Sequence, residues 1–383
     1  MIEALNEKFK DLPEYLAKKK ENGSKIIGYF CNYIPEELIK SADAVPLRLV
    51  SGGIPEAMQA GEQYVKSYCC PYIRSCIGNR VNENPLYKFL DAICVAGTCD
   101  GMKHVEEYWR KYFDIPVFSV GVPKVSNRFR TREHTSEYFK GELTRLKKDL
   151  EILTGTKITN KRLKENIRLY NLIRSRMRRL YDYLNIGSSQ ISWRDIFRIS
   201  HFGYLIDRDE FLGEITNILK ELRIKTSSIE RSEEQVRLML YGSILIFEDT
   251  KVLDIVEVSG GKIVADALCT GSRFWRKDVS IEGSLMDGLV DRYLYNIPCA
   301  HMMDFMMRLN YVIATARESK SQGLLYYNLK SCDTYRSEFR EFEEDVKKEL
   351  GIPSLLIETE YSPADIGTTR TKIEAFLEMV RGV

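Results

Sequence analysis

Short apolar runs alternate with amphipathic stretches along most of the chain, and this alternation is typical of an α/β protein. The runs are short enough for strands, and each is followed by a stretch with helical periodicity. The runs that predict strands are KIIGYFC (25–31), VPLRLV (45–50), FLDAICVAG (89–97), IPVFSVGVP (115–123), VRLMLYGSILIF (236–247), KIVADAL (262–268), GLLYYNL (323–329) and PSLLIETEY (353–361).

Strands that are separated by helices favour parallel sheets with right-handed crossovers. Between 135 and 232 the pattern changes to long amphipathic stretches such as EYFKGELTRLKKDLEILTG, with few strand signals. We therefore expect two doubly wound parallel-sheet domains, Rossmann-like or flavodoxin-like, with a helical segment between them. The predicted ranges are 1–134 for the N-terminal α/β domain with its leading helix, 135–232 for the helical segment and 233–383 for the C-terminal α/β domain.

One unit in each half has the same order of features. Cys99-Asp100 follows a predicted strand and Ile115-Pro116 begins the next one. Cys332-Asp333 and Ile352-Pro353 do the same in the second half. Each half thus has a cysteine at an equivalent position. One sequence cannot show whether this similarity comes from gene duplication or from features that all strand–helix–strand units share.

Composition and charge exclude some classes of function. The 383 residues carry 57 Lys+Arg against 55 Asp+Glu, a net charge of +2, which removes any general electrostatic argument for nucleic acid or an anionic membrane as a partner. No apolar run reaches the roughly 18 to 20 residues that span a bilayer, and the charged start of the chain is unlike a signal peptide. We expect a cytoplasmic protein. Its nine cysteines then serve burial, catalysis or metal binding, because a reducing compartment disfavours disulfides.

Six of the nine cysteines lie at turns where ligands gather in open α/β sheets. Four follow predicted strands, one precedes a proline that suits a first helical turn, and one follows Ile297-Pro298; in chain order they are Cys31, Cys70, Cys99, Cys269, Cys299 and Cys332. Helix amino ends favour thiolates. Burial alone explains Cys94 well, and it is adequate for Cys69 and Cys76.

The spacing of these cysteines leaves more than one cofactor open. Zinc is disfavoured, because paired CxxC motifs are absent and the four histidines are scattered. An iron–sulfur site needs only thiolates that converge in space, and it tolerates wide spacing in the sequence.

At these residues the chain resembles the 2-hydroxyacyl-CoA dehydratase and benzoyl-CoA reductase superfamily, and within it the branch of double-cubane cluster proteins. The resemblance covers nearly the whole chain, from about 27 to 378. The segments that carry it are GYFCNYIPEELIKSADAVPLRL, YCCPYIRSCIG, DAICVAGTCDGMKHVEEYW, ALCTGSRFW, NIPCAHM, KSCDTY and ETEYSPADIGTTRTKIEAFLE.

The resemblance implies an oxygen-sensitive protein with an iron–sulfur cluster in the cleft between two α/β domains. In the dehydratase branch, Cys70, Cys99 and Cys332 would hold a [4Fe-4S] cluster. In the double-cubane branch, Cys31, Cys269 and Cys299 would join them to hold an [8Fe-9S] cluster. One departure concerns the double-cubane pattern, which has a second cysteine two residues after Cys299, where this chain has His301.

The resemblance also implies partners. Electrons would come from an ATP-hydrolysing activator, a homodimer with its own [4Fe-4S] cluster, and would pass to a small-molecule substrate. No GxxxxGK[ST] nucleotide motif occurs in this chain, as expected if the partner hydrolyses the ATP. The chain would form a homodimer or a heterodimer with a related subunit. Three functions stay open: a double-cubane reductase, a [4Fe-4S] subunit of an acyl-CoA dehydratase or reductase, and a non-catalytic cluster carrier.

Four residues are candidates for catalysis, and each of them also has an ordinary structural explanation. Glu36 could be a proton donor, although acidic residues are common in a first helical turn. Arg74 and Ser75 could donate to sulfide or substrate, or be ordinary exposed helix residues. His301 could relay a proton, or be an ordinary surface or core histidine. Asp100 and Asp333 are expected to be helix caps, with a position close to the cluster as the alternative.

Overall fold

The computed structural model describes residues 7–125, 132–185, 190–224 and 235–382. Within these ranges the chain forms two four-stranded sheets in which every pairing is parallel. The strand orders are β2-β1-β3-β4 and β6-β5-β7-β8, so the two halves share one topology. The strands are β1 (Lys25–Tyr29), β2 (Ala44–Arg48), β3 (Ala92–Ala96), β4 (Val117–Val120), β5 (Val236–Gly242), β6 (Gly261–Ala267), β7 (Gly323–Leu329) and β8 (Ser354–Thr359).

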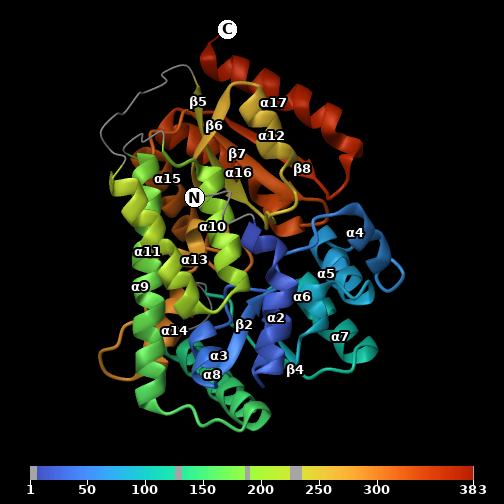
Figure 1. Cartoon of the computed structure of the whole chain (residues 1–383). Coiled ribbons are helices and arrows are strands. Elements are labelled where there is room, and N and C mark those ends of the chain that lie inside the picture. The colour runs from blue at the N-terminus through green and yellow to red at the C-terminus, as the bar shows by residue number, and fades with distance from the viewer. Residues whose placement is uncertain (1–6, 126–131, 186–189, 225–234, 383) are drawn as a thin grey trace.

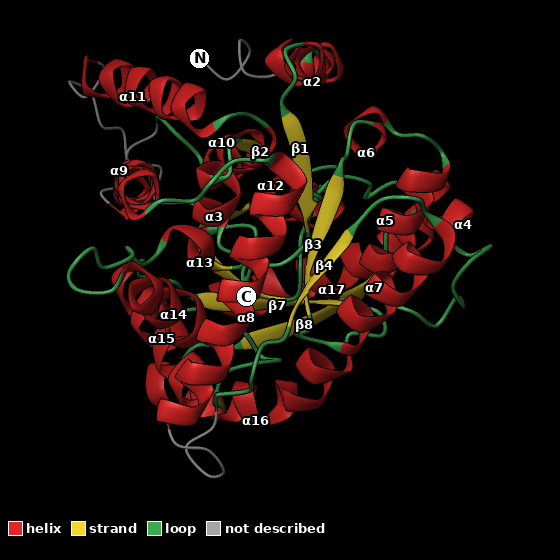
Figure 2. Ribbon diagram, turned by 90° about the horizontal axis from the view of Figure 1, so that it is seen from below, coloured by secondary structure: helices red, strands yellow, loops and turns green. Residues whose placement is uncertain are grey.

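All eight strands lie in the apolar runs that predict them, with β2 and β6 each beginning one residue earlier, and the two-domain α/β fold is confirmed. Each sheet has the strand order of the flavodoxin-like doubly wound fold, in which the chain reverses direction across the sheet after its second strand. Figures 1 and 2 show the two sheets with helices packed around them, and in Figure 1 the N-terminal half is blue and teal and the C-terminal half yellow to red.

Helices surround both sheets. Those of the N-terminal half are α2 (Leu12–Glu21), α3 (Glu36–Ser41), α4 (Pro55–Gly61), α5 (Pro71–Val81), α6 (Pro85–Lys88) and α7 (Asp100–Tyr112). Those between the sheets are α8 (Arg132–Thr154), α9 (Asn160–Asn185), α10 (Trp193–Leu205) and α11 (Arg208–Ile224). The C-terminal half has α12 (Lys251–Val258), α13 (Ser272–Trp275), α14 (Leu285–Tyr295), α15 (Phe305–Glu318), α16 (Asp333–Leu350), the short 3-10 helix η1 (Pro363–Asp365) and α17 (Ile366–Arg381).

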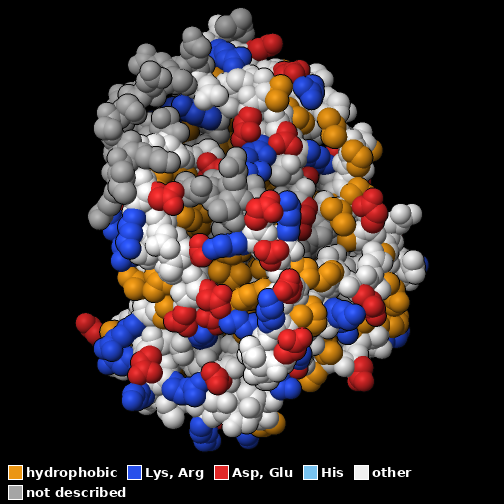
Figure 3. All heavy atoms as spheres, viewed as in Figure 1, with side chains coloured by type: hydrophobic (Ala, Val, Ile, Leu, Met, Phe, Trp, Pro, Cys, Tyr) orange, Lys and Arg blue, Asp and Glu red, His pale blue; other side chains and the backbone are white. Residues whose placement is uncertain are grey.

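The predicted start of the helical segment at 135 falls in the first turn of α8. Its predicted end at 232 lies outside the described residues. None of the helices in the described ranges combines the length and the apolar character needed to cross a membrane. On the face drawn in Figure 3, Lys and Arg side chains are interspersed with Asp and Glu, in keeping with the near-balanced charge of the whole chain.

Successive side chains of a strand pack into two different hydrophobic clusters, one on each face of the sheet. Along β5, Leu238 and Leu240 join one hydrophobic cluster, while Met239 and Tyr241 join another on the opposite face. This follows from the two-residue period of a strand, and a strand buried on both faces therefore reads as a continuous apolar run. The largest cluster includes side chains from both sheets and from α10 and α11, so the two halves share a core.

Part of the C-terminal half packs on the N-terminal sheet. Val279, Leu289, Tyr293 and Ile297 belong to the same buried cluster as Ile27 of β1. Helix α14 contacts α8 and α9, and it lies beside α8 in Figure 1. The chain therefore returns to the first half before it completes the second sheet, and this exchange fixes the two halves against each other.

Two adjacent glutamates of α3 anchor this packing through buried ion pairs. Glu37 accepts hydrogen bonds from Arg174 of α9 at 2.6 Å and from Tyr293 of α14 at 2.7 Å. Glu36 accepts from Arg208 of α11, with the Nε to Oε2 distance at 2.8 Å, and also from Tyr29. All of these side chains are buried, so each carboxylate depends on its partners for the hydrogen bonds that water would supply.

We expect Arg174→Met to lower the free energy of unfolding by about 3 to 5 kcal/mol, because it leaves the Glu37 carboxylate buried without its cation. Denaturant titration measures this loss. The matched control is Arg178→Met on the same helix, which breaks a half-exposed pair with Asp278 and a hydrogen bond to the Trp275 carbonyl and should cost less than about 2 kcal/mol. Equal losses in the two variants would contradict the assignment.

His201 of α10 predicts a dependence of stability on pH. Its Nδ1 lies 2.9 Å from the Phe197 carbonyl, and burial lowers the pKa of the ring to about 3. The unfolded chain then takes up this proton at a higher pH than the folded protein does, so the stability is complete above about pH 6.5 and falls as the pH drops toward 3.

Between pH 7 and pH 5 this histidine should account for a loss of about 2 kcal/mol in the free energy of unfolding. The variant His201→Phe, whose ring can pack against Phe197, should show a shallower slope of stability against pH over the same window. An unchanged slope in denaturant titrations at several pH values would rule out this role, whatever the absolute stability of the variant.

Candidate functional site

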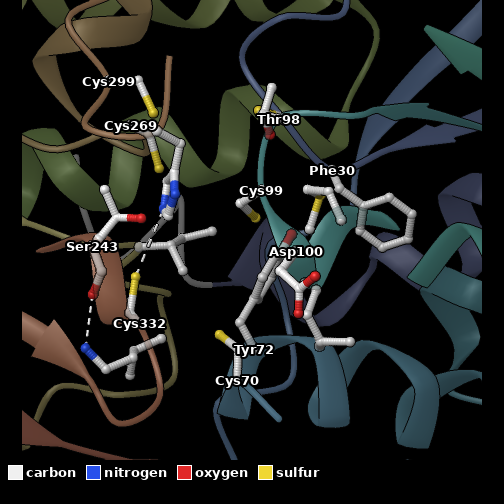
Figure 4. Close-up of a pocket in the computed structure, with 18 of the residues that line it drawn as sticks. Phe30, Cys70, Tyr72, Thr98, Cys99, Asp100, Ser243, Cys269, Cys299 and Cys332 are labelled. Atoms are coloured by element: carbon white, nitrogen blue, oxygen red, sulfur yellow. Dashed lines mark hydrogen bonds between the residues drawn. The ribbon is translucent and has the colours of Figure 1, made fainter. Parts of the chain in front are cut away.

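A cavity of about 430 Å³ lies between the two halves and is lined by residues from both. All six cysteines singled out by the sequence line it: Cys31, Cys70, Cys99, Cys269, Cys299 and Cys332. In Figure 4, Cys70 and Cys99 face the cavity from the N-terminal half, and Cys269, Cys299 and Cys332 face it from the C-terminal half. The structure thus brings together residues that lie up to about three hundred positions apart in the chain.

A seventh cysteine, Cys69, also lines the cavity and is half-buried. Burial was the expected explanation for this residue, so its position at the cavity is a correction. Its only signal in the sequence is that it stands next to Cys70. Cys94 is fully buried on a face of the first sheet, within a hydrophobic cluster, and Cys76 is buried in α5, so burial does account for these two.

Three of the cavity cysteines stand directly before helices. Cys70, Cys99 and Cys332 are the N-cap residues of α5, α7 and α16, and we call them the helix-start cysteines. Each therefore lies at the positive end of a helix dipole, where backbone N–H groups favour a negatively charged sulfur. The backbone N–H groups of Tyr72 and Ile73, for example, oppose the rise that burial causes in the pKa of Cys70.

The other three predicted ligands lie on loops, and we call them the loop cysteines. Cys31 follows β1, Cys269 follows β6, and Cys299 lies between α14 and α15. The charges of other cavity cysteines add to the effect of burial: those of Cys31 and Cys269 raise the pKa of Cys299, and those of Cys269 and Cys99 raise the pKa of Cys31. The cavity thus holds three helix-start thiols and three loop thiols.

Burial favours the protonated form of the Cys31, Cys99 and Cys299 thiols unless a positive charge joins them. It raises the pKa of Cys31 and of Cys299 to about 11 and that of Cys99 to about 12, and neighbouring cysteines add to the rise. Bound metal cations reverse such a shift, because they bind the deprotonated sulfur directly.

No three His, Cys, Asp or Glu side chains in the described ranges meet closely enough to hold a single metal ion. An iron–sulfur cluster is wider than one ion, so the thiolates that ligate it stand apart around it. The donor set at the cavity, six half-buried cysteines from both halves of the chain, fits such a group.

Of the four candidates for catalysis, His301 alone lines the cavity. Its Nε2 lies 3.8 Å from the sulfur of Cys332. Burial, together with the positive charges of Arg273 and Arg308, lowers the pKa of His301 to about 4. The ring is therefore neutral near pH 7 and can exchange a hydrogen bond with a group in the cavity.

The structure does not bring Glu36, Arg74 or Ser75 to the cavity wall. The Glu36 carboxylate is held by Arg208 and Tyr29, as described above. Ser75 donates to the carbonyl of Gly52. Their positions in the sequence resemble those of site residues because they follow Cys31 and Cys70, but their side chains turn into the packing around the site.

Arg74 has a supporting role behind the wall of the cavity. Its Nε donates to the carbonyl of Cys69 at 3.0 Å, and its two terminal nitrogens contact Glu62 and Glu360. Glu360 follows β8 of the C-terminal half, so Arg74 joins the cysteine-bearing loop to the opposite domain.

Asp100 and Asp333 are not the helix caps that the sequence suggested. They are the first residues of α7 and α16, and the cysteines before them occupy the capping positions. Both aspartates line the cavity, and the Asp100 side chain is 88% exposed, which places it at the rim.

Two arginines and an asparagine in the wall were not among the predicted site residues: Arg48, Arg273 and Asn32. All three are buried. A lone charge within the apolar run VPLRLV was the available signal for Arg48, and the GSR turn after Cys269 was the signal for Arg273.

Fold and site together define a two-domain α/β protein that presents cysteines from both halves to one central cavity. The family model described as 2-hydroxyglutaryl-CoA dehydratase, D-component, matches residues 31–380. The chain belongs to this family, as the resemblance of its motifs implied.

Relatives extend over nearly the full length. The Escherichia coli (strain K12) protein YjiM is 27% identical over 94% of this chain and 93% of its own length. The (R)-phenyllactyl-CoA dehydratase beta subunit of Clostridium sporogenes is 27% identical over 97% of each chain. A benzoyl-CoA reductase subunit of Thauera aromatica is 24% identical over 82% of this chain and 81% of its own. The chain is thus similar to components of both dehydratases and reductases.

Proposed function

We propose that this protein is the iron–sulfur component of an oxygen-sensitive reductase that does low-potential, ATP-dependent chemistry on a small substrate. The observation that carries the proposal is the convergence of six cysteines from two halves on one cavity. The helix-start cysteines and the loop cysteines would each hold one half of a double-cubane [8Fe-9S] cluster. Electrons would come from a separate ATP-hydrolysing [4Fe-4S] activator homodimer.

The bound cluster would supply single electrons at low potential. The residues of this chain would bind and shield it: the cysteine sulfurs as ligands, and the apolar walls as a barrier to water. Neutral His301 would exchange a hydrogen bond with substrate or with the sulfur of Cys332. The exposed Asp100 at the rim leaves a route by which a small molecule reaches the helix-start cysteines.

A second function is favoured by the names of the relatives, two of which are a dehydratase beta subunit and a subunit of a benzoyl-CoA reductase. In that case Cys70, Cys99 and Cys332 would hold one [4Fe-4S] cluster, and the chain would pair with a related subunit. The three helix-start positions of these cysteines support this ligand set equally well.

Anaerobic purification followed by iron and sulfide analysis separates the two functions. The double cubane requires about eight irons per chain, and Cys269→Ser should lower that number because it removes a ligand of one half. The matched control is Cys94→Ala, a fully buried thiol in β3 outside the cavity, which should retain the full iron content. A value near four that Cys269→Ser leaves unchanged would favour the dehydratase subunit instead.

Mixing with an activator tests the redox role. We expect the reduced, ATP-supplied activator to reduce the cluster of this chain, measured as a change in its electron paramagnetic resonance signal. Cys99→Ser should abolish the change, because it removes a helix-start ligand. A chain that holds iron and sulfide but is never reduced by an activator would be a cluster carrier. A stable homodimer without affinity for a CoA ester would argue against the dehydratase subunit.

A further inference from the structure

Two buried arginines in the wall of the cavity have no carboxylate partner among the described residues. Arg48, the last residue of β2, donates from one terminal nitrogen to the carbonyl of Cys269 at 3.0 Å. Its Nε and its other terminal nitrogen have no hydrogen-bond partner. Arg273 of α13 donates to the carbonyls of Pro298 and Gly242 and to the hydroxyl of Tyr335, and its Nε has no partner.

Such an arrangement is costly for a buried cation. Arg48 and Arg273 are 0% and 1% exposed, and rings of Tyr204 and Phe274 lie within 5.1 Å of the Arg48 guanidinium. Cation–π contacts offset part of the desolvation cost, but they leave the net charge uncompensated. A buried positive charge at a cavity wall therefore predicts a negative group within the cavity.

Most other buried arginines, unlike Arg48 and Arg273, are paired with a carboxylate. Arg174, Arg208 and Arg308 each have a carboxylate partner, and so does Arg74. Arg292 is the exception: it is buried, its Nε and one terminal nitrogen have no partner, and it donates to the carbonyl of Phe274. Because Arg292 does not line the cavity, it provides a matched control for the two arginines that do.

Both cavity arginines lie beside the loop cysteines. Arg48 binds the backbone of Cys269 directly. Arg273 donates to the carbonyl of Pro298, the residue before Cys299, at 2.8 Å, and it lines the same cavity as Cys269 and Cys299. Asn32, next to Cys31, adds an unpartnered, buried amide to the same wall.

The helix-start cysteines are stabilised by different means. Each stands at the amino end of a helix of eleven residues or more, and Arg74, the arginine near Cys70, is already paired with Glu62 and Glu360. Helix dipoles therefore favour negative charge at the helix-start cysteines, whereas the guanidinium charges of Arg48 and Arg273 lie near the loop cysteines.

We propose that Arg48 and Arg273 are the counter-charges and hydrogen-bond donors of the half-cluster held by Cys31, Cys269 and Cys299, and that they raise its reduction potential above that of the other half. This inference rests on the proposed double-cubane function. Positive charge near a cluster stabilises the form with the extra electron, so this half would hold the electron first. The half on the helix-start cysteines, near the exposed Asp100, would pass the electron to substrate.

The test is a potentiometric titration of the anaerobically loaded, full-length protein, with iron and sulfide counted in each sample. Arg48→Met and Arg273→Met should make the first midpoint potential more negative. We expect at least a tenfold lower ratio of reduced to oxidised cluster at a fixed potential, which corresponds to about 59 mV for a one-electron couple. Arg292→Met should keep the wild-type midpoint.

Charge-conserving variants keep the proposal testable if a Met variant does not fold. Arg48→Lys and Arg273→Lys keep the positive charge but lose the planar set of donors, so they should shift the midpoint in the same direction by less than the Met variants. If a Met variant does not fold, as judged by circular dichroism, the Lys variant decides for that position, and a wild-type midpoint then overturns the proposal.

The outcomes separate this inference from the proposed function. Loaded Met variants with wild-type midpoints would overturn the inference and leave the function intact. Loss of iron from folded Arg48→Met or Arg273→Met protein, with full iron in Arg292→Met, would support a role in holding the cluster. A wild-type chain that binds about four irons, or none, would overturn the double-cubane function itself, whatever the arginines do.

Discussion

Parallel strands deliver their carboxyl ends, and the amino ends of the helices that follow, to one edge of a sheet. In this protein two sheets of the same topology direct such edges toward one cavity, and four of the cavity cysteines lie on the segments that leave those edges. Cys31, Cys99, Cys269 and Cys332 follow β1, β3, β6 and β7, which are the two central strands of one sheet, an edge strand and a central strand of the other. The parallel pairing thus places the sulfurs together without any motif of closely spaced cysteines.

Concentrating sulfurs in a buried cavity creates an electrostatic problem, because burial opposes the thiolate form that binds metal. The pKa values of Cys31, Cys99 and Cys299 are all raised by burial and by their neighbours. The fold places helix amino ends at the helix-start cysteines and buried guanidinium groups near the loop cysteines, and both favour negative charge on sulfur. Under the proposed function, this difference between the two groups of cysteines would set the order in which the two halves of the cluster accept an electron.

The position of the two halves depends on a scaffold away from the sulfurs. Glu36 and Glu37 follow Cys31 in the sequence, but their carboxylates bind Arg208 and Arg174 on the central helices, and α14 closes over the first sheet. Arg74 similarly joins the loop of Cys69 to Glu360 in the other half. Charged residues near the candidate ligands therefore hold the walls of the cavity in place, and the match to the family spans this scaffold as well as the cysteine-bearing loops.

The sequence by itself was sufficient for the eight strands and the two parallel sheets, because strand periodicity is a local property of the chain. The turn positions of six cysteines, together with the family resemblance, indicated that they share one cleft. Only the tertiary structure decided which charged side chains face that cavity. Glu36 and Ser75 looked like site residues, yet they turn into the packing, while Arg48, inside an apolar strand, faces the site. Residues that are neighbours in sequence point to opposite sides of an element, and partners such as Arg48 and Cys269 meet only when two distant segments pack together.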